Sequence, residues 1–257
     1  MKVSVITVSY NSSATIEDSI ISVVSQSYHN REHIIVDGGS TDGTETVIHR
    51  NVDGIHRLVI EPDDGIYDAM NKGIGLSSGD IVGFLNADDV YANERVLARV
   101  ADVFSDPEIA ACYADLVYVD PDNLNKVVRY WQSCPYKDGL FGKGWSPPHP
   151  TFFVRKSIYE TFGCFDLSYP IGNDIELMMR FLARNKIASV YIPEVFVKMR
   201  TGGISNKNIS NILRQNIEIM KAAKRNSVPL SPFVFIFSKI FSRAYQFRTK
   251  PKTAGHN

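Results

Sequence analysis

Residues 3–24, VSVITVSYNSSATIEDSIISVV, contain the unit that decides the fold. Residues 3–9 are apolar or β-branched and have no helical period, which is typical of a buried strand. From residue 16 onward apolar side chains recur at helical spacing, and Thr15 together with Asp18 resembles a capping box at the start of a helix. The stretch therefore predicts a buried strand followed by an amphipathic helix.

The same strand-then-helix pattern returns three times before residue 105. The predicted strands are HIIVD at residues 33–37, LVIE at 58–61 and IVGFLN at 81–86, and the helices after them begin at Thr44, Tyr67 and Asn93. Alternating strands and helices are typical of an α/β fold with a mainly parallel, open sheet flanked by helices. We expect this architecture for residues 1–105.

The alternation stops past Ser105. YADLVYVD and KVVRYW flank PDNLN, which predicts a hairpin, and the Gly- and Pro-rich GKGWSPPHPTFF predicts a loop. Helices are expected at residues 155–162, 174–184 and 209–226, with two short strands around Val190 and Val197. We expect a smaller α+β half at residues 106–228 and a separate C-terminal tail at 229–257.

Composition narrows the possible functions. Lys plus Arg and Asp plus Glu both number 28 in 257 residues, so overall charge gives no support for a nucleic-acid partner. The three cysteines show no spacing typical of a zinc site or a disulfide framework, which favours reduced, structural thiols. The N-terminus is too polar for a signal peptide, and no window is apolar enough to span a membrane. These features predict a cytoplasmic protein.

Three acidic turns occur in the first ninety residues: VDGGSTDGT from Val36, EPDDGIYDAMNKG from Glu61, and NADD ending at Asp89. The carboxyl ends of the strands of an open α/β sheet lie along one edge, so these carboxylates should converge on one crevice. Crowded carboxylates repel one another unless a cation lies between them. A divalent cation carrying nucleotide phosphates is the expected occupant.

In their order, VSVITVSYN, VDGGSTDGT, EPDDGIYDAMNKG, GFLNADD, HPTFF and NDIELMMR resemble the motifs of family 2 glycosyltransferases over residues 1–205. The resemblance implies a Rossmann-like GT-A fold and inverting transfer of a hexose or N-acetylhexosamine from a UDP-sugar. It is strongest to bacterial enzymes that extend O-antigen or exopolysaccharide repeat units on a polyprenyl diphosphate carrier. Residues 1–105 would then bind the nucleotide sugar and residues 106–228 the acceptor.

The resemblance also implies a metal site at NADD. Asp88 and Asp89 would bind Mn²⁺ or Mg²⁺ and the donor ribose, and the sequence leaves open which carboxylate takes which role. Asn86, which stands where the first Asp of the family motif is often found, is also implied to bind the donor, as is Asp88. Without the resemblance, an Asp pair after a strand is more often a helix cap or a turn.

For the nucleotide, the resemblance assigns Asp37 to the base, flanked by Val8 and Tyr10. Asp63 and Lys72 become donor-site candidates. The plain alternatives are an ordinary turn at Asp37 and a capped helix in which Lys72 pairs with Asp68 on one helical face.

Asp174 is the candidate catalytic base. Inversion requires a base opposite the leaving group, and Asp174 is the first acidic residue of NDIELMMR, where the family has its base. Glu176 lies two residues further and cannot share that helical face, while an N-cap role for Asp174 is the structural alternative. His149, Arg200 and Ser205 are implied to lie near the acceptor or the diphosphate.

The tail is basic and amphipathic. Glu218 is the last acidic residue, and Lys or Arg occurs eight times after it. From Phe233 to Phe247 a helix would carry a broad apolar face rich in Phe, which predicts either docking on the body or binding to an anionic membrane surface. A carrier-linked acceptor favours the second, with the protein peripheral on the inner face of the cytoplasmic membrane.

Three other classes of protein are alternatives to a glycosyltransferase. A nucleotidyltransferase would need a basic Gly-rich loop after its first strand, where this chain has SYNSSAT. A dinucleotide oxidoreductase would need GxGxxG at that position. A non-catalytic nucleotide-binding protein would not need the acidic residues Asp88, Asp89 and Asp174.

Overall fold

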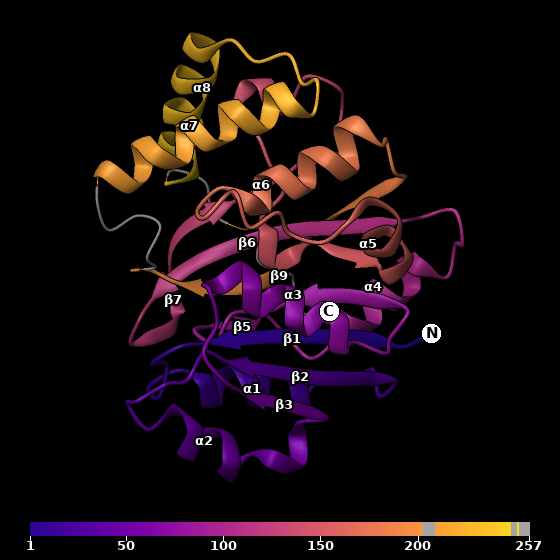
Figure 1. The fold of residues 1–257 in the computed structure, drawn as a ribbon, viewed down its shortest axis with the longest axis vertical. Helices are drawn as coiled ribbons and strands as arrows, with labels where there is room; N and C mark the ends of the chain where they lie inside the picture. The colour runs from indigo at the N-terminus through magenta and orange to yellow at the C-terminus, as the bar shows by residue number, and fades with distance from the viewer. Residues whose placement is uncertain (203–208, 248–250, 252–257) are drawn as a thin grey trace.

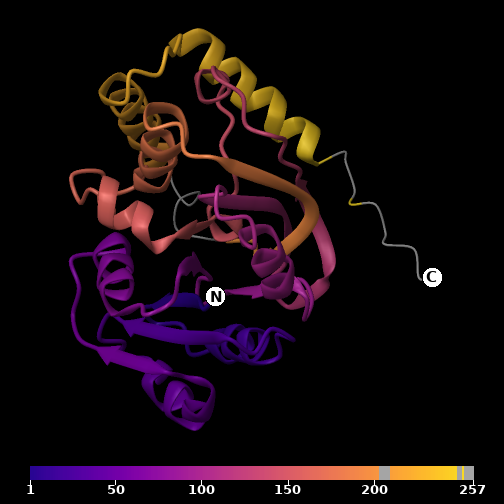
Figure 2. The same ribbon diagram turned by 90° about the vertical axis from the view of Figure 1, so that its right-hand side faces the viewer.

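The computed structural model describes residues 1–202, 209–247 and 251, so Ser205 lies outside the described residues. In the described chain nine strands form one strongly curled sheet, and helices pack around it (Figure 1, Figure 2). The two helices nearest the C-terminus lie together at one end of the molecule (Figure 1).

The first four strands are parallel and have the order β3-β2-β1-β4, which confirms the α/β pattern predicted for this half. They are β1 (Val3–Ser9), β2 (Arg31–Asp37), β3 (Arg57–Ile60) and β4 (Ile81–Phe84), with α1 (Ile16–Val24), α2 (Thr44–Arg50), the 3-10 turn η1 (Val52–Gly54) and α3 (Ile66–Leu76) between them. The chain moves outward from β1 to β3 and then returns to the other side of β1. Ligands of open α/β sheets bind beside such a switch point.

The sheet continues past β4 in the order β8-β6-β9-β5, and β7 pairs with β6 as the predicted hairpin. These strands are β5 (Asp89–Tyr91), β6 (Ala111–Asp120), β7 (Asn123–Trp131), β8 (Phe153–Arg155) and β9 (Ser189–Arg200). Pairing is parallel between β6 and β9 and antiparallel at β4–β8, β6–β8 and β5–β9.

Two details of these strands differ from the prediction. The two short strands expected around Val190 and Val197 are one strand, β9, because a register shift against β6 accommodates Pro193. β5 and β8 have no counterpart among the predicted strands, since three residues are too few to show an alternating pattern.

The remaining helices are α4 (Val96–Phe104), α5 (Lys156–Phe162), α6 (Asn173–Met178), α7 (Ile209–Arg225) and α8 (Pro232–Gln246). The predicted loop contains the 3-10 turns η2 (Phe141–Lys143) and η3 (His149–Thr151), and α6 continues as the π-helical η4 (Met179–Arg184). The capping box predicted at α1 is wrong. The Thr15 side chain makes no capping hydrogen bond, and the Asp18 carboxylate pairs instead with Arg200 on β9.

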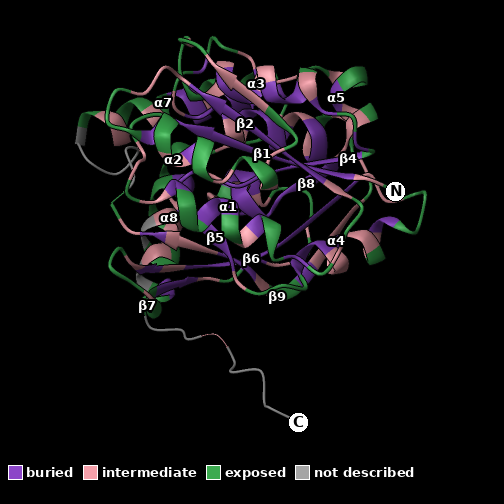
Figure 3. Ribbon diagram, turned by 90° about the horizontal axis from the view of Figure 1, so that it is seen from below, coloured by how far each residue is buried: buried purple, intermediate pink, exposed green. Residues whose placement is uncertain are grey.

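The core consists of two large apolar clusters, and most residues of the central strands β1, β2, β4 and β6 are buried (Figure 3). One cluster includes Ile6, Phe84 and Leu177, and the other includes Val5, Leu97 and Phe153. Gly83 is needed where β8 meets β4, because a Cβ at that position would lie 2.2 Å from the Phe153 ring. The short strand β8 can therefore approach β4 closely and join the two halves of the sheet.

Helix α8 docks on the body with the side opposite to its Phe-rich face. Phe235 is buried in the core, and Gln246 is also buried. Phe233, Phe237 and Phe241 are exposed instead. Among the helices of the described chain, none has the length and apolar character needed to cross a bilayer.

Candidate functional site

The predicted donor residues lie at one edge of the sheet. Strands β3, β2, β1 and β4 are parallel neighbours, so the segments that follow them lie side by side. Tyr10 follows β1, Gly38 follows β2, Asp63 follows β3 and Asn86 follows β4. The parallel order thus brings three separate acidic turns to the same edge, as the sequence predicts.

Asp37 anchors its own turn. The carboxylate is fully buried and accepts hydrogen bonds from the Ser9 hydroxyl (2.7 Å), the Ser40 hydroxyl (2.7 Å) and the Ser40 N–H (2.8 Å). The N–H of Gly39 also donates to it at 3.1 Å. Both carboxylate oxygens are therefore occupied by protein donors, and the side chain fixes the loop between β2 and α2.

Asp63 and Tyr10 form the accessible part of this edge. A Cβ at Gly38 would lie 2.5 Å from Oδ2 of Asp63 and 3.4 Å from the Tyr10 ring, so the glycine lets both side chains lie against the backbone of the β2 turn. Tyr10 is 65% exposed, whereas Val8 is buried in the core. Of the predicted base-flanking pair, only Tyr10 is on the surface.

Lys72 belongs to an ion-pair network on α3. Its Nζ lies 3.0 Å from Glu61 and 3.4 Å from Asp68, and it donates to the carbonyl of Pro62 at 3.0 Å. The hydrogen bond with Glu61 and the other contacts raise the pKa of Lys72. The Lys72 amine thus stabilises the turn that carries Asp63 by binding Glu61 and Pro62.

Asp88 and Asp89 differ in exposure. Asp89 is fully buried, its Oδ2 accepts a hydrogen bond from Asn86 at 3.0 Å, and its Oδ1 has no partner in the described chain. Asp88 is half-buried, and its carbonyl accepts a hydrogen bond from Arg200 at 2.7 Å. Arg200 also reaches Pro121 and Asp18, so it ties the β4–β5 turn to the β6–β7 hairpin and to α1.

The electrostatics of this turn suit a divalent cation. Burial raises the pKa of Asp88, and burial followed by the charge of Asp88 raises the pKa of Asp89 well above its usual range. An ion such as Mg²⁺ takes one or two carboxylate ligands from the protein and its other ligands from phosphates and water. The two adjacent carboxylates of this turn match that requirement, and one of them has a buried oxygen without a partner. The described residues hold no group of three or more His, Cys, Asp or Glu side chains that would form a closed metal site.

Asp174 lies at the start of α6, in contact with α3. It is half-buried in the first turn of α6, and the Tyr67 hydroxyl of α3 lies 3.4 Å from its Oδ1 and donates to the Ile171 carbonyl at 2.9 Å. The N-cap position belongs to Gly172, so Asp174 does not cap the helix. Burial raises its pKa, with His149 acting in the opposite direction.

His149 connects Asp174 with the end of β4. Its ring stacks on Phe84 with centroids 5.4 Å apart and packs edge-on to Phe165 at 5.8 Å. Burial lowers the pKa of His149, and attraction to Asp174 partly offsets that effect. The imidazole is therefore held beside Asp174 mainly in its neutral form.

Glu176 has a different role from Asp174, as their spacing predicts. It is buried and forms an ion pair with Arg180 at 2.8 Å. Arg180 in turn donates to the carbonyls of Phe162, Gly163 and Cys164. This pair fixes the end of α5 against α6 and leaves Asp174 as the carboxylate of the motif that borders the site.

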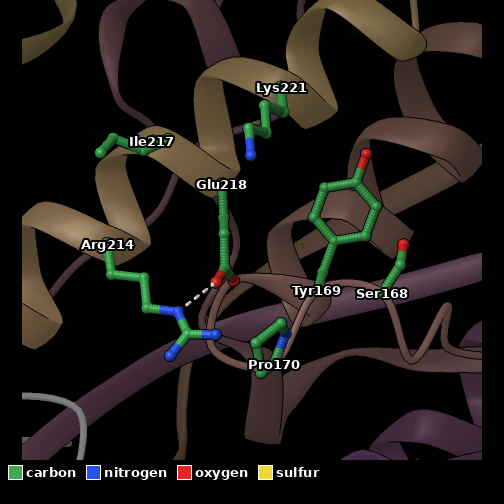
Figure 4. A pocket seen from close by; sticks show the side chains of 7 residues that line it. All are labelled: Ser168, Tyr169, Pro170, Arg214, Ile217, Glu218 and Lys221. Atoms are coloured by element: carbon green, nitrogen blue, oxygen red, sulfur yellow. Dashed lines mark ion pairs between the residues drawn. The ribbon is translucent and has the colours of Figure 1, made fainter.

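The turn before α6 is pinned from α7. A cavity of about 380 Å³ lies between α7 and residues 168–170 (Figure 4). In its wall, Glu218 accepts the N–H groups of Ile171 and Gly172, both at 2.9 Å, and pairs with Arg214 at 3.3 Å. These bonds set the position from which Asp174 projects.

Sequence reasoning missed two residues beside Asp174. The sequence predicts only that Tyr67 lies in a helix, whereas the structure shows that its hydroxyl contacts Asp174. Lys239 of α8 points inward, donates to Asn216 at 2.8 Å and lies 5.3 Å from the Phe235 ring centroid. Burial and Arg243 lower the pKa of Lys239 to about 8, while Asp174 raises it. No sequence signal pointed to Lys239, because a helical wheel does not show which face of α8 meets the body.

Comparisons with known proteins identify the family of this chain. The profile of the family described as Glycosyl transferase family 2 matches residues 4–162. A PGL/p-HBAD biosynthesis glycosyltransferase of Mycobacterium bovis is 28% identical over 251 residues, which cover 96% of this chain and 94% of that protein.

Solved structures share the fold. TarS of S. aureus, in complex with UDP-GlcNAc, superposes with a TM-score of 0.68 at 17% identity over 98% of this chain and 77% of its own. The mannosyltransferase PcManGT of Pyrobaculum calidifontis, in complex with GDP-Man and Mn²⁺, gives a TM-score of 0.65 at 20% identity over 93% and 69%.

Proposed function

Because the chain belongs to glycosyl transferase family 2 and has the GT-A fold, we propose that it transfers a hexose or N-acetylhexosamine from a UDP-sugar, with inversion, to a polyprenyl-diphosphate-linked saccharide. The observation that carries the proposal is the position of Asp174. Its carboxylate lies beside Tyr67 and His149, next to the sheet edge that collects Asp63 and Asp88. The relative named for PGL/p-HBAD biosynthesis supports a role in cell-surface glycan synthesis.

In this proposal the donor base binds against Tyr10 and Asp63. The exposed Tyr10 ring offers a stacking face, and the Asp63 carboxylate can accept a hydrogen bond from the base. Asp37 supports this contact by holding the turn, since its own oxygens are already occupied. Lys72 keeps the Asp63 turn closed through Glu61 and Pro62.

Asp88 and Asp89 would hold Mn²⁺ or Mg²⁺ together with the donor diphosphate. The ion would neutralise charge on the departing UDP. Arg200 supports this turn by binding the Asp88 carbonyl.

Asp174 accepts the proton from the attacking acceptor hydroxyl. Its pKa is raised by burial, which makes its ionised carboxylate a stronger base than that of an exposed Asp. The Tyr67 hydroxyl of α3 contacts the carboxylate, and His149 of η3 is held by its stacking on Phe84. The acceptor sugar must then enter from the side of α6 and α8.

The exposed Phe row of α8 fits a membrane-bound acceptor. Phe233, Phe237 and Phe241 recur every four residues on the outward face of α8, and basic residues flank the helix. Such a helix would lie in the interface of an anionic membrane. The protein would then be peripheral on the inner face of the cytoplasmic membrane, where lipid-linked saccharides are extended.

The test is UDP release from a UDP-sugar with Mn²⁺ and a synthetic diphosphate-lipid acceptor, for wild type, Asp174→Asn and the exposed control Asp122→Asn. We expect Asp174→Asn to lower turnover by roughly 10²- to 10⁴-fold with donor binding retained, and Asp122→Asn to match wild type. Equal turnover in all three proteins would exclude Asp174 as the base. Sugar 1-phosphate in place of UDP as the product would indicate a nucleotidyltransferase, and no turnover with any donor would favour a binding protein.

A further inference from the structure

A second cavity, of about 250 Å³, lies between the C-terminal part of α8 and the end of β7. Tyr130, Trp145 and Tyr245 supply aromatic surface, and Gln132, Ser133 and Gln246 supply hydroxyl and amide groups. Each residue that lines it has a neutral side chain, and burial raises the pKa of the Cys134 thiol. The cavity is therefore polar without being charged.

Two of the residues that line the cavity each carry a buried polar atom without a partner. Ser133 is only 8% exposed, and neither its Oγ nor the Nε1 of Trp145 has a hydrogen-bond partner in the described chain. A buried polar atom left unpaired costs roughly 1–3 kcal/mol, so such atoms in a native fold call for an explanation. A hydroxyl and an indole N–H in one wall would together satisfy a ligand that both donates and accepts.

The wall around these atoms is firmly held. Asp115 accepts hydrogen bonds from the N–H of Ser133 at 2.7 Å and from the hydroxyl of Tyr191 at 2.8 Å, and it also binds the Tyr130 hydroxyl. Trp145 packs against Tyr113 and Phe141 with centroids 5.9 and 5.5 Å apart. The two unpaired groups are thus presented by a fixed frame, and this favours a preformed site.

The chemistry of the wall selects a class of ligand. A phosphate would find no cation among the lining residues, and a lipid chain would leave both polar atoms unsatisfied. A sugar ring has hydroxyls that donate and accept, and an apolar face that packs on an aromatic side chain. The volume is slightly below that of sites for drug-sized ligands, about 300–1,000 Å³, and suits a single ring.

The cavity adjoins the part of α8 that carries Lys239. A Cβ at Gly144, next to Trp145, would lie 3.3 Å from the Cβ of Lys239, and Lys239 attracts Asp174. Ser242 lines the cavity and lies three residues after Lys239, about one helical turn along α8. A saccharide that places a hydroxyl at Asp174 could reach this cavity with a neighbouring sugar.

We propose that this cavity, bounded by Trp145, Ser133 and the inner face of α8, is a subsite for one uncharged sugar ring of the acceptor saccharide. The inference rests on the proposed function, because it assigns the cavity to the acceptor of that reaction. It makes α8 a wall of the acceptor site, whose outward face is the one expected to meet the membrane.

Binding can be followed with Trp145 itself. The chain has two tryptophans, so Trp131→Phe leaves Trp145 as the sole indole reporter. Titration with methyl glycosides of glucose, galactose and their N-acetyl analogues should give a saturable change in emission for at least one of them. Ser133→Ala should weaken that binding roughly three- to tenfold, and Ser168→Ala, in the other cavity, should leave it unchanged.

Two further measurements separate the possible outcomes. UDP and UDP-sugar should bind equally well to wild type and Ser133→Ala, and the variant should raise KM for the acceptor at unchanged kcat. If UDP-sugars change the Trp145 emission and methyl glycosides do not, the cavity holds the donor sugar and the proposal is wrong. Failure of every glycoside to bind, while UDP release persists, overturns the subsite and leaves the transferase function intact.

Discussion

The outward face of α8 allows membrane binding to be predicted quantitatively. Phe233, Phe237 and Phe241 are 78%, 59% and 73% exposed, which amounts to roughly 400 Å² of ring surface at about 200 Å² per Phe. Full transfer from water would contribute about 10 kcal/mol at 25 cal/mol per Å². An interfacial helix immerses only part of this surface, so we take half, about 5 kcal/mol. Replacing all three rings by Ser should therefore weaken binding by roughly 10³-fold or more.

The assay is sedimentation with vesicles that contain anionic lipid. The matched control is Ile21→Ser with Val52→Ser, two exposed apolar residues of the donor half. The control should sediment like wild type, and all proteins should melt at similar temperatures because the replaced side chains are exposed. Raising the salt concentration should weaken binding of wild type, since basic residues flank the helix. Equal sedimentation of the Phe variant and wild type would refute the assignment of this face.

Three other predictions concern the site. Asp63→Asn should weaken UDP binding by roughly tenfold with little change in melting temperature. Asp37→Asn should lower the melting temperature, because it breaks buried hydrogen bonds. Calorimetry and thermal melts that gave the reverse pattern would contradict these roles. Because burial raises the pKa of Asp174, kcat should fall as the pH is lowered through that raised pKa. This fall should begin at a higher pH than the pKa of an ordinary Asp would give. If the residual activity of Asp174→Asn showed the same fall at the same pH, the titrating group would be another residue. Chelation with EDTA should abolish UDP release and weaken UDP binding, and Mn²⁺ or Mg²⁺ should restore both; full turnover in EDTA would exclude the metal role of Asp88 and Asp89.

The first half of the fold followed from the sequence because its signals are local. Each strand is an apolar run followed by a turn and a periodic helix, so the parallel order and the convergence of Asp37, Asp63 and Asp88 were predictable. The second half depends on long-range pairing. β5 and β8 are strands only because β9, β4 and β6 supply hydrogen-bond partners, and the course of β9 through Pro193 depends on its register with β6.

The site shows the same division. Motif positions located Asp174 and His149, but spacing could not show that Asp37 would be saturated by Ser9 and Ser40. The sequence also could not predict that Lys239 points inward, because a helical wheel shows the two faces of α8 but not which face meets the body.

Arg200 has a practical consequence for engineering. Its guanidinium is 8% exposed and joins three segments from far apart in the chain: Asp18 in α1, the Asp88 carbonyl and the Pro121 carbonyl. Chimeras that graft residues 106–228 of a relative onto residues 1–105 of this chain must therefore carry a compatible partner for Asp18. Otherwise the chimera would lose the contacts that tie the β4–β5 turn to α1 and to the β6–β7 hairpin, and it would fail for reasons unrelated to the sugar.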